Sequence, residues 1–210
     1  MRSTVTRGGG ESTPGGFVTV DRALDDAVAR ELIVLCDEQG NPTGTAEKWS
    51  SHHGQTPLHL AFSCYVFDGD GAFLTTRRAL TKNVWPGVWS NTVCGHPSPG
   101  ESFTDAIARR LDYELGMTAR NVEAVLPVHL YRAPPFAGIV EHEFCPVFVA
   151  RVASAPHPNP IEVGACAWID WDEFVRRALE DPASDYSWWC KNQLRELLGT
   201  PLIDRYSRAE

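Results

Sequence analysis

The residues best suited to chemistry lie between Trp85 and Met117, a stretch that reads W-P-G-V-W-S-N-T-V-C-G-H-P-S-P-G-E-S-F-T-D-A-I-A-R-R-L-D-Y-E-L-G-M. It carries a thiol at Cys94, an imidazole at His96 and a carboxylate at Glu114. Side chains of these three kinds can carry protons or bind a metal ion. Tight-turn residues surround the thiol and an acid-bearing segment follows it, so we expect most of the chemistry of this chain here.

The second half of this stretch predicts a helix that begins after Ser102 and ends at Gly116. Ser102 followed by Asp105 is a variant of the capping box that begins helices, and Gly116 stands where a left-handed residue ends them. Glu114 falls within the apolar face of this helix, where an ionised carboxylate needs a partner. It either pairs with Arg110 one turn earlier or holds a cation. The apolar residues of that face are Phe103, Ala106, Ile107, Leu111 and Leu115.

Two further histidines, His52 and His59, flank Pro57, which disfavours a continuous helix between them. His59 opens a predicted strand over residues 58–67, whose successive side chains face opposite sides of a sheet. A single histidine in a strand is usually structural. Two near one strand start, together with the histidine that follows the thiol, favour a metal site.

Two acids, Glu141 and Glu143, share one face of a predicted strand over residues 139–149. Apolar residues on both faces of this strand indicate that it is buried. Two carboxylates there are costly unless they bind a cation or carry protons. The alternative is a frayed strand start that remains in contact with water.

Basic residues gather at two places, although the chain as a whole is acidic, with a formal charge of −8. Lys48 ends a predicted hairpin over residues 31–49, and Arg77, Arg78 and Lys82 lie in one short segment. Each could be a solvated surface residue. The acidic balance argues against nucleic-acid binding and gives no general attraction for an anion. An anionic substrate would therefore need a local cluster such as these residues provide.

Residues 85–97, W-P-G-V-W-S-N-T-V-C-G-H-P, resemble the cysteine motif of the type I isopentenyl-diphosphate isomerases, which have the Nudix fold. Several long motifs in one order indicate this family rather than chance. The further motifs that match, between about residues 32 and 198, are T-G-T-A-E-K at 43–48, L-H-L-A-F at 58–62, T-R-R-A-L at 76–80, Y-E-L-G at 113–116 and G-I-V-E-H-E-F-C-P-V-F at 138–148.

The Nudix box, G-x5-E-x7-R-E-U-x-E-E-x-G-U with U apolar, is only partly present. Glu101 and Glu114 match its acids, but Arg110 and Tyr113 stand where the box has two glutamates. Nudix hydrolases use that acid cluster to bind metal and activate water. A Nudix-type diphosphate hydrolase therefore stays an alternative with two acids missing, and a non-catalytic metal-binding or nucleotide-binding module is a second alternative.

The resemblance implies that the chain interconverts isopentenyl diphosphate and dimethylallyl diphosphate by protonation and deprotonation through a tertiary carbocation. It implies Glu143 with Tyr131 as proton donor, Cys94 as the opposing acceptor, and Trp189 as a cation–π wall, with Trp188 as its rival. Which of Cys94 and Glu143 gives the first proton stays open. The implied diphosphate contacts are Lys48, Arg78, Lys82 and Arg110.

The resemblance also implies two metal sites and no flavin. One site, for Mn²⁺, Zn²⁺ or Mg²⁺, would use nitrogen and oxygen ligands. His52 is chosen over His53 because the match between Lys48 and His59 then needs no gap. In the second site, Glu114 would hold Mg²⁺ together with the diphosphate. The implied ligands of the first site are His52, His59, His96, Glu141 and Glu143.

The expected fold is a single Nudix-like domain of the α/β (α+β) class, in which helices flank mixed β-sheets, with an N-terminal β-hairpin extension. We expect a flexible leader over residues 1–30, the domain over 31–200 and a C-terminal tail over 201–210. Six cysteines without C-x-x-C spacing and the lack of a hydrophobic signal predict reduced thiols and a cytoplasmic protein. The expected partner is a small allylic or homoallylic diphosphate, with no nucleic acid and no membrane, and the chain is expected as a monomer or weak dimer.

Overall fold

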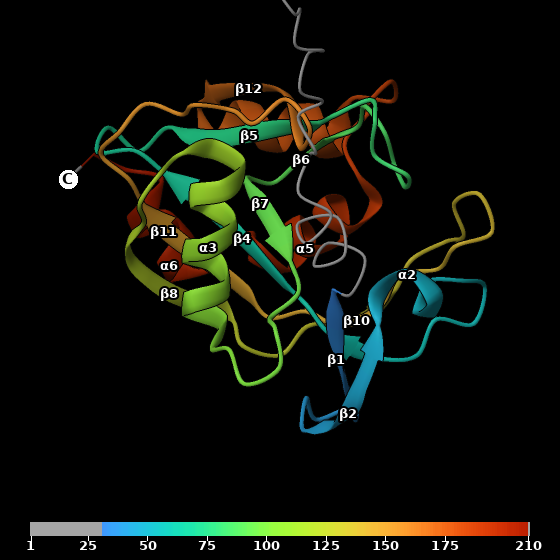
Figure 1. The fold of residues 1–210 in the computed structure, drawn as a ribbon. Coiled ribbons are helices and arrows are strands. Elements are labelled where there is room, and N and C mark those ends of the chain that lie inside the picture. Colours follow the sequence, from blue (N-terminus) through green and yellow to red (C-terminus); the bar gives the residue numbers. More distant parts are fainter. Residues whose placement is uncertain (1–30, 210) are drawn as a thin grey trace, which may run out of the picture. The chain divides into compact units, whose positions relative to one another are not determined.

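The computed structural model describes residues 31–209, so the predicted leader lies outside the described residues (Figure 1). The strands are β1 (Leu32–Cys36), β2 (Pro42–Glu47), β3 (His59–Leu60), β4 (Phe62–Phe67), β5 (Phe73–Arg78), β6 (Trp89–Ser90), β7 (Val93–Gly95), β8 (Arg120–Leu126), β9 (Leu130–Arg132), β10 (His142–Phe144), β11 (Val147–Arg151) and β12 (Val163–Ile169). The helices are α2 (Lys48–Ser51), α3 (Phe103–Leu115), α4 (Trp171–Val175), the π-helical turn η1 (Arg176–Glu180), α5 (Trp188–Leu197) and α6 (Pro201–Tyr206). None of the described helices is long and apolar enough to cross a membrane.

Within the described residues, the strands form two sheets. The smaller sheet has the order β2-β1-β3-β10-β9, and the larger one has the order β12-β5-β4-β11-β8, with β6 beside β5 and β7 beside β4. Parallel and antiparallel pairs occur in both sheets, which confirms the expected mixed sheets. The predicted N-terminal hairpin is confirmed as the antiparallel pair of β1 and β2.

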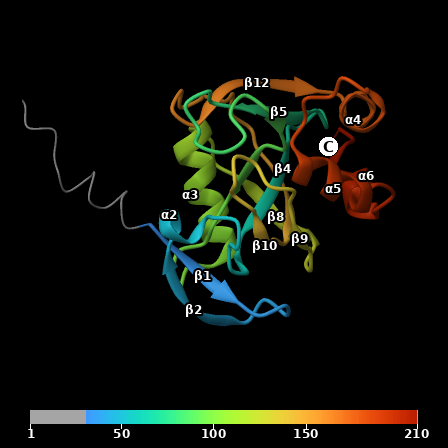
Figure 2. The ribbon, with the colours of Figure 1, turned by 90° about the vertical axis from the view of Figure 1, so that its right-hand side faces the viewer.

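Helices cover both faces of the larger sheet (Figures 1 and 2). Side chains of β4 alternate between the two faces because successive residues of a strand point in opposite directions. Phe62, Cys64 and Val66 pack with α3. Tyr65 and Phe67 pack with α4, α5 and α6 on the other face. Both faces of β4 are therefore buried, which explains its continuous apolar sequence.

Helix α3 has the predicted ends. The Ser102 hydroxyl accepts a hydrogen bond from the Asp105 backbone N–H, and Gly116 closes the helix in the left-handed region at φ 60°. Residues 201–210 were expected as a tail, but they contain α6, whose Ile203 and Tyr206 are buried in the core. The packed domain therefore extends beyond residue 200, because these apolar side chains cover the larger sheet.

The two long strands predicted at residues 58–67 and 139–149 are each divided between the sheets. The first breaks at Ala61, giving β3 and β4, and the second breaks at Cys145 and Pro146, giving β10 and β11. Proline has no N–H to donate to a ladder, and the Pro146 carbonyl instead accepts from the Ser63 backbone N–H. Both segments therefore cross from the smaller to the larger sheet side by side. Residues before and after this crossing face one cavity.

Candidate active site

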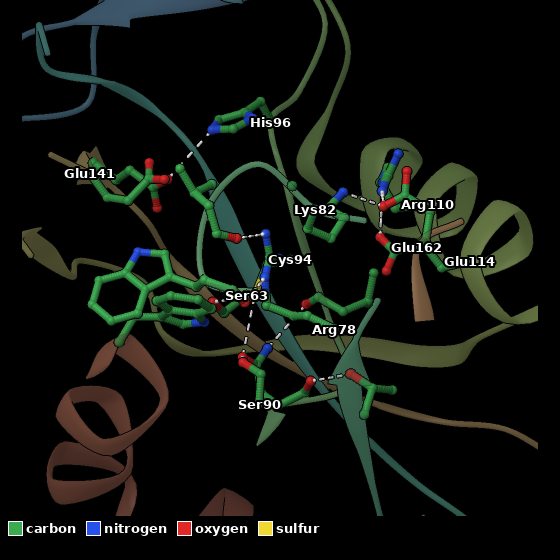
Figure 3. A pocket seen from close by; sticks show the side chains of 18 of the residues that line it. Ser63, Arg78, Lys82, Ser90, Cys94, His96, Arg110, Glu114, Glu141 and Glu162 are labelled. Carbon is green, nitrogen blue, oxygen red and sulfur yellow. Dashed lines mark hydrogen bonds and ion pairs between the residues drawn. The ribbon is translucent and has the colours of Figure 1, made fainter. Parts of the chain in front are cut away.

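A cavity of about 420 Å³ lies where the two sheets meet (Figure 3). It is lined by every site residue predicted from the sequence except His59, which is fully buried beside it. The lining residues come from both sheets, from α2 and α3 and from the start of α5. Sequence positions that lie far apart are thus brought to one place.

The thiol of Cys94 is held on β7 beside Ser63 of β4, because these two residues are paired in register. The Ser63 hydroxyl lies 3.3 Å from the Cys94 sulfur, and the sulfur lies 3.2 Å from Asn91 Oδ1. The Asn91 amide nitrogen donates to the backbone carbonyls of Cys64 and Val93, which fixes its oxygen toward the thiol. Cys94 therefore donates to Asn91 and is protonated in this arrangement.

The titration of Cys94 agrees with a protonated thiol. Burial raises the pKa of Cys94 to about 11, and the negative charges of Glu143 and Glu114 act in the same direction. A thiol with this pKa is almost wholly protonated near neutral pH. The protein without substrate therefore holds a proton on this side chain.

Glu143 belongs to a row of three residues across the smaller sheet. Tyr131 of β9, Glu143 of β10 and His59 of β3 are paired in register, so their side chains point to the same face. The Tyr131 hydroxyl donates to Glu143 Oε2 at 2.5 Å. Burial, and then the charge of Glu143, raise the pKa of Tyr131 well above its usual value. Tyr131 therefore keeps its proton and acts toward Glu143 as a donor.

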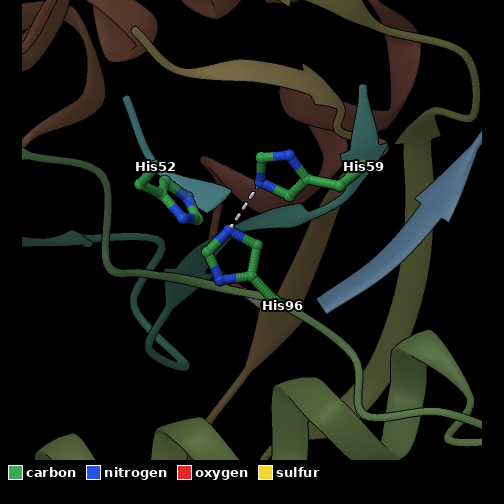
Figure 4. A group of neighbouring side chains, drawn as sticks. All are labelled: His52, His59 and His96. Atoms are coloured by element: carbon green, nitrogen blue, oxygen red, sulfur yellow. Dashed lines mark hydrogen bonds between the residues drawn. The ribbon is translucent and has the colours of Figure 1, made fainter. Parts of the chain in front are cut away.

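His59 of this row lies close to two further histidines, His52 and His96 (Figure 4). The ring centroids of His52, His59 and His96 lie 4.9–5.6 Å apart. One ring nitrogen from each of these three histidines lies within 4.8 Å of the other two. A second group, with one possible ligand atom each from His59, Glu141 and Glu143, meets the same distance limit. His53, the alternative to His52, lies outside this group and closes a turn with Thr56.

The hydrogen bonds of these histidines fit a metal site. The Nδ1 atoms of His52 and His59 lie 2.6 and 2.9 Å from the carbonyls of Lys48 and Pro57, so each ring carries its proton on Nδ1 and leaves Nε2 as a lone pair. His59 Nε2 faces His96 Nε2 at 3.2 Å, and His52 Nε2 faces a Glu141 oxygen at 3.5 Å. Nitrogen and carboxylate oxygen atoms that converge in this way form an arrangement that a divalent cation can bind.

Two of the three histidines, His59 and His96, favour the neutral imidazole form that a metal ion binds. Burial lowers the pKa of His59. Burial, and then the neighbouring His59, hold the pKa of His96 well below its usual value. Burial acts the same way on His52, but the Glu141 carboxylate outweighs it and raises the pKa of His52. The nitrogen and carboxylate donor set fits Mn²⁺, Zn²⁺ or Mg²⁺.

The other end of the cavity is rich in charge. Arg110 donates to Glu114 from Nε at 2.9 Å and from Nη2 at 2.7 Å, so the pairing inferred within the helix is present. The same Nη2 lies 3.3 Å from an oxygen of Glu162, which also accepts from Lys82. Lys48 lies at the start of α2 and pairs with Glu31 at 2.8 Å. Three of the predicted cations, Lys48, Lys82 and Arg110, therefore stand in ion pairs rather than in contact with solvent alone.

Arg78 connects the charged end to the aromatic wall. Its guanidinium donates to the carbonyls of Val84 and Trp85 and lies 5.7 Å from the ring centroid of Trp189. Trp189 lines the cavity, whereas Trp188 packs against Tyr131 with ring centroids 5.7 Å apart. Of the two tryptophans left open by the sequence, Trp189 is therefore the one placed to face a ligand.

Sequence reasoning missed several residues that contact the site. Asn91 lies in the recognised motif at 85–97 and Ser63 in the strand predicted over 58–67, but their contacts with the thiol depend on strand register. Trp85 lines the cavity with a positive φ of 52° and packs against Phe136 with ring centroids 4.8 Å apart. Glu162 gave no local signal, because its partners come from α3 and from the loop after β5.

A model of the NUDIX domain family matches residues 57–190 of the chain. Curated relatives similar to the chain carry the name isopentenyl-diphosphate Delta-isomerase. The relative from Agromyces mediolanus is 52% identical over 165 residues, covering 79% of this chain and 80% of the relative. The one from Paenarthrobacter aurescens is 48% identical over 182 residues, covering 87% and 98%. The one from Klebsiella pneumoniae is 42% identical over 181 residues, covering 86% and 98%.

Solved structures share the fold at low sequence identity. A crystal structure of a Deinococcus radiodurans protein has a TM-score of 0.62 and 15% identity, and it covers 80% of this chain and 99% of that chain. A MutT protein from Methanosarcina mazei has a TM-score of 0.53 and 16% identity, with coverage of 72% and 96%. These two likenesses concern the fold alone.

Proposed function

Because the chain belongs to the Nudix family and, within it, to the isopentenyl-diphosphate Delta-isomerases, we propose that it interconverts isopentenyl diphosphate and dimethylallyl diphosphate. The reaction adds a proton at the terminal alkene carbon and removes one from the carbon next to C1, through a tertiary carbocation. It needs two proton carriers around a cavity that keeps nucleophilic water away. The observation that carries the proposal is the presence of both carriers, Cys94 and Glu143, in one cavity.

Cys94 and Glu143 are the proton carriers in this proposal. They stand on different sheets, Cys94 on β7 and Glu143 on β10. Because the reaction is an interconversion, the carrier that donates in one direction accepts in the other. Tyr131 supports Glu143, since its hydroxyl donates to the carboxylate and stabilises the ionised form. Trp189 supplies an electron-rich face to the carbocation.

The diphosphate is held at the charged end of the cavity. Lys48, Arg78, Lys82 and Arg110 line that cavity and are the contacts we assign to it. Arg78 can form bidentate hydrogen bonds, whereas the lysines act as point charges. Fixing the charged end positions the alkene between the two carriers, which is a large part of what an enzyme contributes to such a step.

Two metal sites complete the proposal. His52, His59, His96, Glu141 and Glu143 would hold one ion, and Glu114 would hold Mg²⁺ with the diphosphate. A bound divalent ion supplies positive charge, which fixes the carboxylates in the first site and neutralises the diphosphate in the second. The converging nitrogen and oxygen atoms of the first site and the carboxylate of the second are the features of this chain that fit such ions.

Hydrolysis of a diphosphate is the rival reaction. At the helix positions where hydrolases carry two acids, this chain has Arg110, paired with Glu114, and Tyr113, which is half exposed. Glu101 pairs with Arg109 outside the cavity lining. The isomerase therefore has the better chemical support, and measurement of released phosphate separates the two reactions.

The test is to replace each carrier. Cys94→Ala and Glu143→Gln are each expected to lower kcat by at least about 10³, within the range of general acid–base catalysis. Cys166→Ala is the matched control, because Cys166 is a partly buried thiol that does not line the cavity, and it is expected to keep wild-type kcat. If either carrier variant folds and retains more than about a tenth of wild-type kcat, the assignment of that residue fails.

A further inference from the structure

Four charged side chains form a row at the diphosphate end of the cavity, in the order Lys82, Glu162, Arg110 and Glu114 (Figure 3). Glu162 Oε2 lies 2.5 Å from Lys82 Nζ and 3.3 Å from Arg110 Nη2, and the same Nη2 lies 2.7 Å from Glu114 Oε1. The side chains are between 11% and 27% exposed. Glu162 thus contacts two of the four cations that the proposed function assigns to the diphosphate.

The charges of this row cancel. Two cations stand against two carboxylates, so the row carries no net charge at neutral pH. In a partly buried site, charges act on one another more strongly than in water. A diphosphate that approached the row alone would meet two carboxylates as well as two cations, and each cation would have to leave its partner. The row as it stands is therefore a poor anion site.

The two carboxylates are also neighbours. Both lie against the same nitrogen of Arg110. Glu162 is paired with two cations, Lys82 and Arg110, as expected of an ionised carboxylate. Glu162 is thus charged and lies close to Glu114, the residue assigned to Mg²⁺, and carboxylate oxygens are the ligands that Mg²⁺ prefers.

We propose that Glu162 is a positioning residue that couples divalent-cation binding to diphosphate binding. In the protein without ligands it holds Lys82 and Arg110. When a divalent cation neutralises Glu114 and Glu162, the charge of the row rises from zero to two positive charges, and Lys82 and Arg110 become available to the diphosphate. The assignment of these cations to a diphosphate rests on the proposed function.

Coupling of this kind is reciprocal, because each ligand raises the affinity for the other by the same factor. Wild-type protein is therefore expected to bind inorganic diphosphate about 5–150-fold more tightly with Mg²⁺ than without, the usual range of such coupling. In Glu162→Gln the row already carries one positive charge. Its metal-free affinity for diphosphate is expected to exceed that of the wild type, and the gain from Mg²⁺ is expected to shrink.

The experiment measures binding of inorganic diphosphate to the full chain by calorimetry, after removal of metal with a chelator and again at saturating Mg²⁺. A role limited to holding Lys82 and Arg110 in place predicts the opposite sign, since Glu162→Gln would then bind diphosphate more weakly in both conditions. That result, or unchanged affinities in both conditions, would overturn the proposal. Glu162→Asp keeps the charge and is expected to keep the coupling.

The control variant is Glu173→Gln, which removes a carboxylate on α4 that pairs with Arg176 and Arg177 and does not line the cavity. It is expected to bind diphosphate as the wild type does in both conditions. Turnover of isopentenyl diphosphate is measured separately. Absence of turnover in a wild type that shows the metal coupling would overturn the isomerase proposal while leaving the role of Glu162 in place, so the two failures are distinguishable.

Discussion

The hydroxyl of Tyr131 offers a direct test of the proposed role of Glu143 in proton transfer. It donates to Glu143 Oε2 at 2.5 Å, while the other carboxylate oxygen faces His96 and His59 at 3.4 and 3.9 Å. Tyr131→Phe removes this donor and keeps the ring, which packs against Trp188. The variant therefore isolates the effect of one hydrogen bond on the carboxylate.

The size of the effect follows from the charge on the acceptor. A hydrogen bond to a charged group contributes about 1.5–3 kcal/mol. At about 1.36 kcal/mol for each tenfold change in rate, its loss from the transition state lowers kcat by about 10- to 160-fold. KM for the diphosphate is expected to change little, because Tyr131 lies in the smaller sheet, away from the cations assigned to the charged end.

The assay is the initial rate of conversion of isopentenyl diphosphate, measured beside a thermal melt. Tyr206→Phe is the matched control, because the Tyr206 hydroxyl lies 2.5 Å from the Asn121 carbonyl and 2.7 Å from the Glu123 carboxylate, outside the cavity. It loses a similar bond and some stability, and it is expected to keep wild-type kcat. A kcat of Tyr131→Phe within twofold of the wild type, or an equal loss in the control, would refute the role of this hydroxyl.

Two further predictions concern the metal site and the thiol. His59→Ala and Glu141→Gln are each expected to abolish tight binding of one metal ion per chain, because ligands of a single site are removed; metal analysis that shows full occupancy would place the ion elsewhere. The pKa of Cys94, raised to about 11, means that its thiolate is scarce at neutral pH. Its alkylation in chelator-treated protein, followed by mass spectrometry of the Cys94 peptide, should therefore be slow at pH 7 and still rise above pH 9, whereas a plateau near pH 8 would contradict a buried, protonated thiol.

Local signals in the sequence predict the parts of the structure that depend on a few neighbouring residues. The ends of α3 follow from Ser102 and Gly116, and its buried face follows from helical spacing. The hairpin of β1 and β2 follows from an apolar run and a turn. In each case the interacting residues are close in the sequence, so the local sequence pattern is enough to predict the helix or the hairpin.

The arrangement of the site depends on contacts between distant residues, which local patterns do not contain. The apolar runs at residues 58–67 and 139–149 do not show where each segment leaves the smaller sheet and enters the larger one. Pro146 was a local sign of that crossing. The row of Tyr131, Glu143 and His59 requires the register of three strands. The position of Glu162 is set by Lys82 and Arg110, which lie far before it in the chain.

The division of the proposed metal ligands between the sheets has a consequence for local unfolding. His59 and Glu143 lie on strands of the smaller sheet, whereas His96 follows β7 of the larger one. A bound ion would therefore tie the sheets together. The smaller sheet has a thin core of its own, and stability is not uniform across such a molecule. Its buried apolar cluster is Val34, Cys36, Leu60 and Phe144.

An ion that binds the folded smaller sheet and not its locally unfolded form stabilises the folded form, and it does so more strongly at higher ion concentration. Removal of the ion should therefore speed amide hydrogen exchange in β1, β3, β9 and β10. Exchange in β4 and β11, which are covered by helices on both faces, should hardly change. The metal would thus stabilise the smaller sheet against local unfolding. On chelation, the smaller sheet would unfold first and the rest of the domain later.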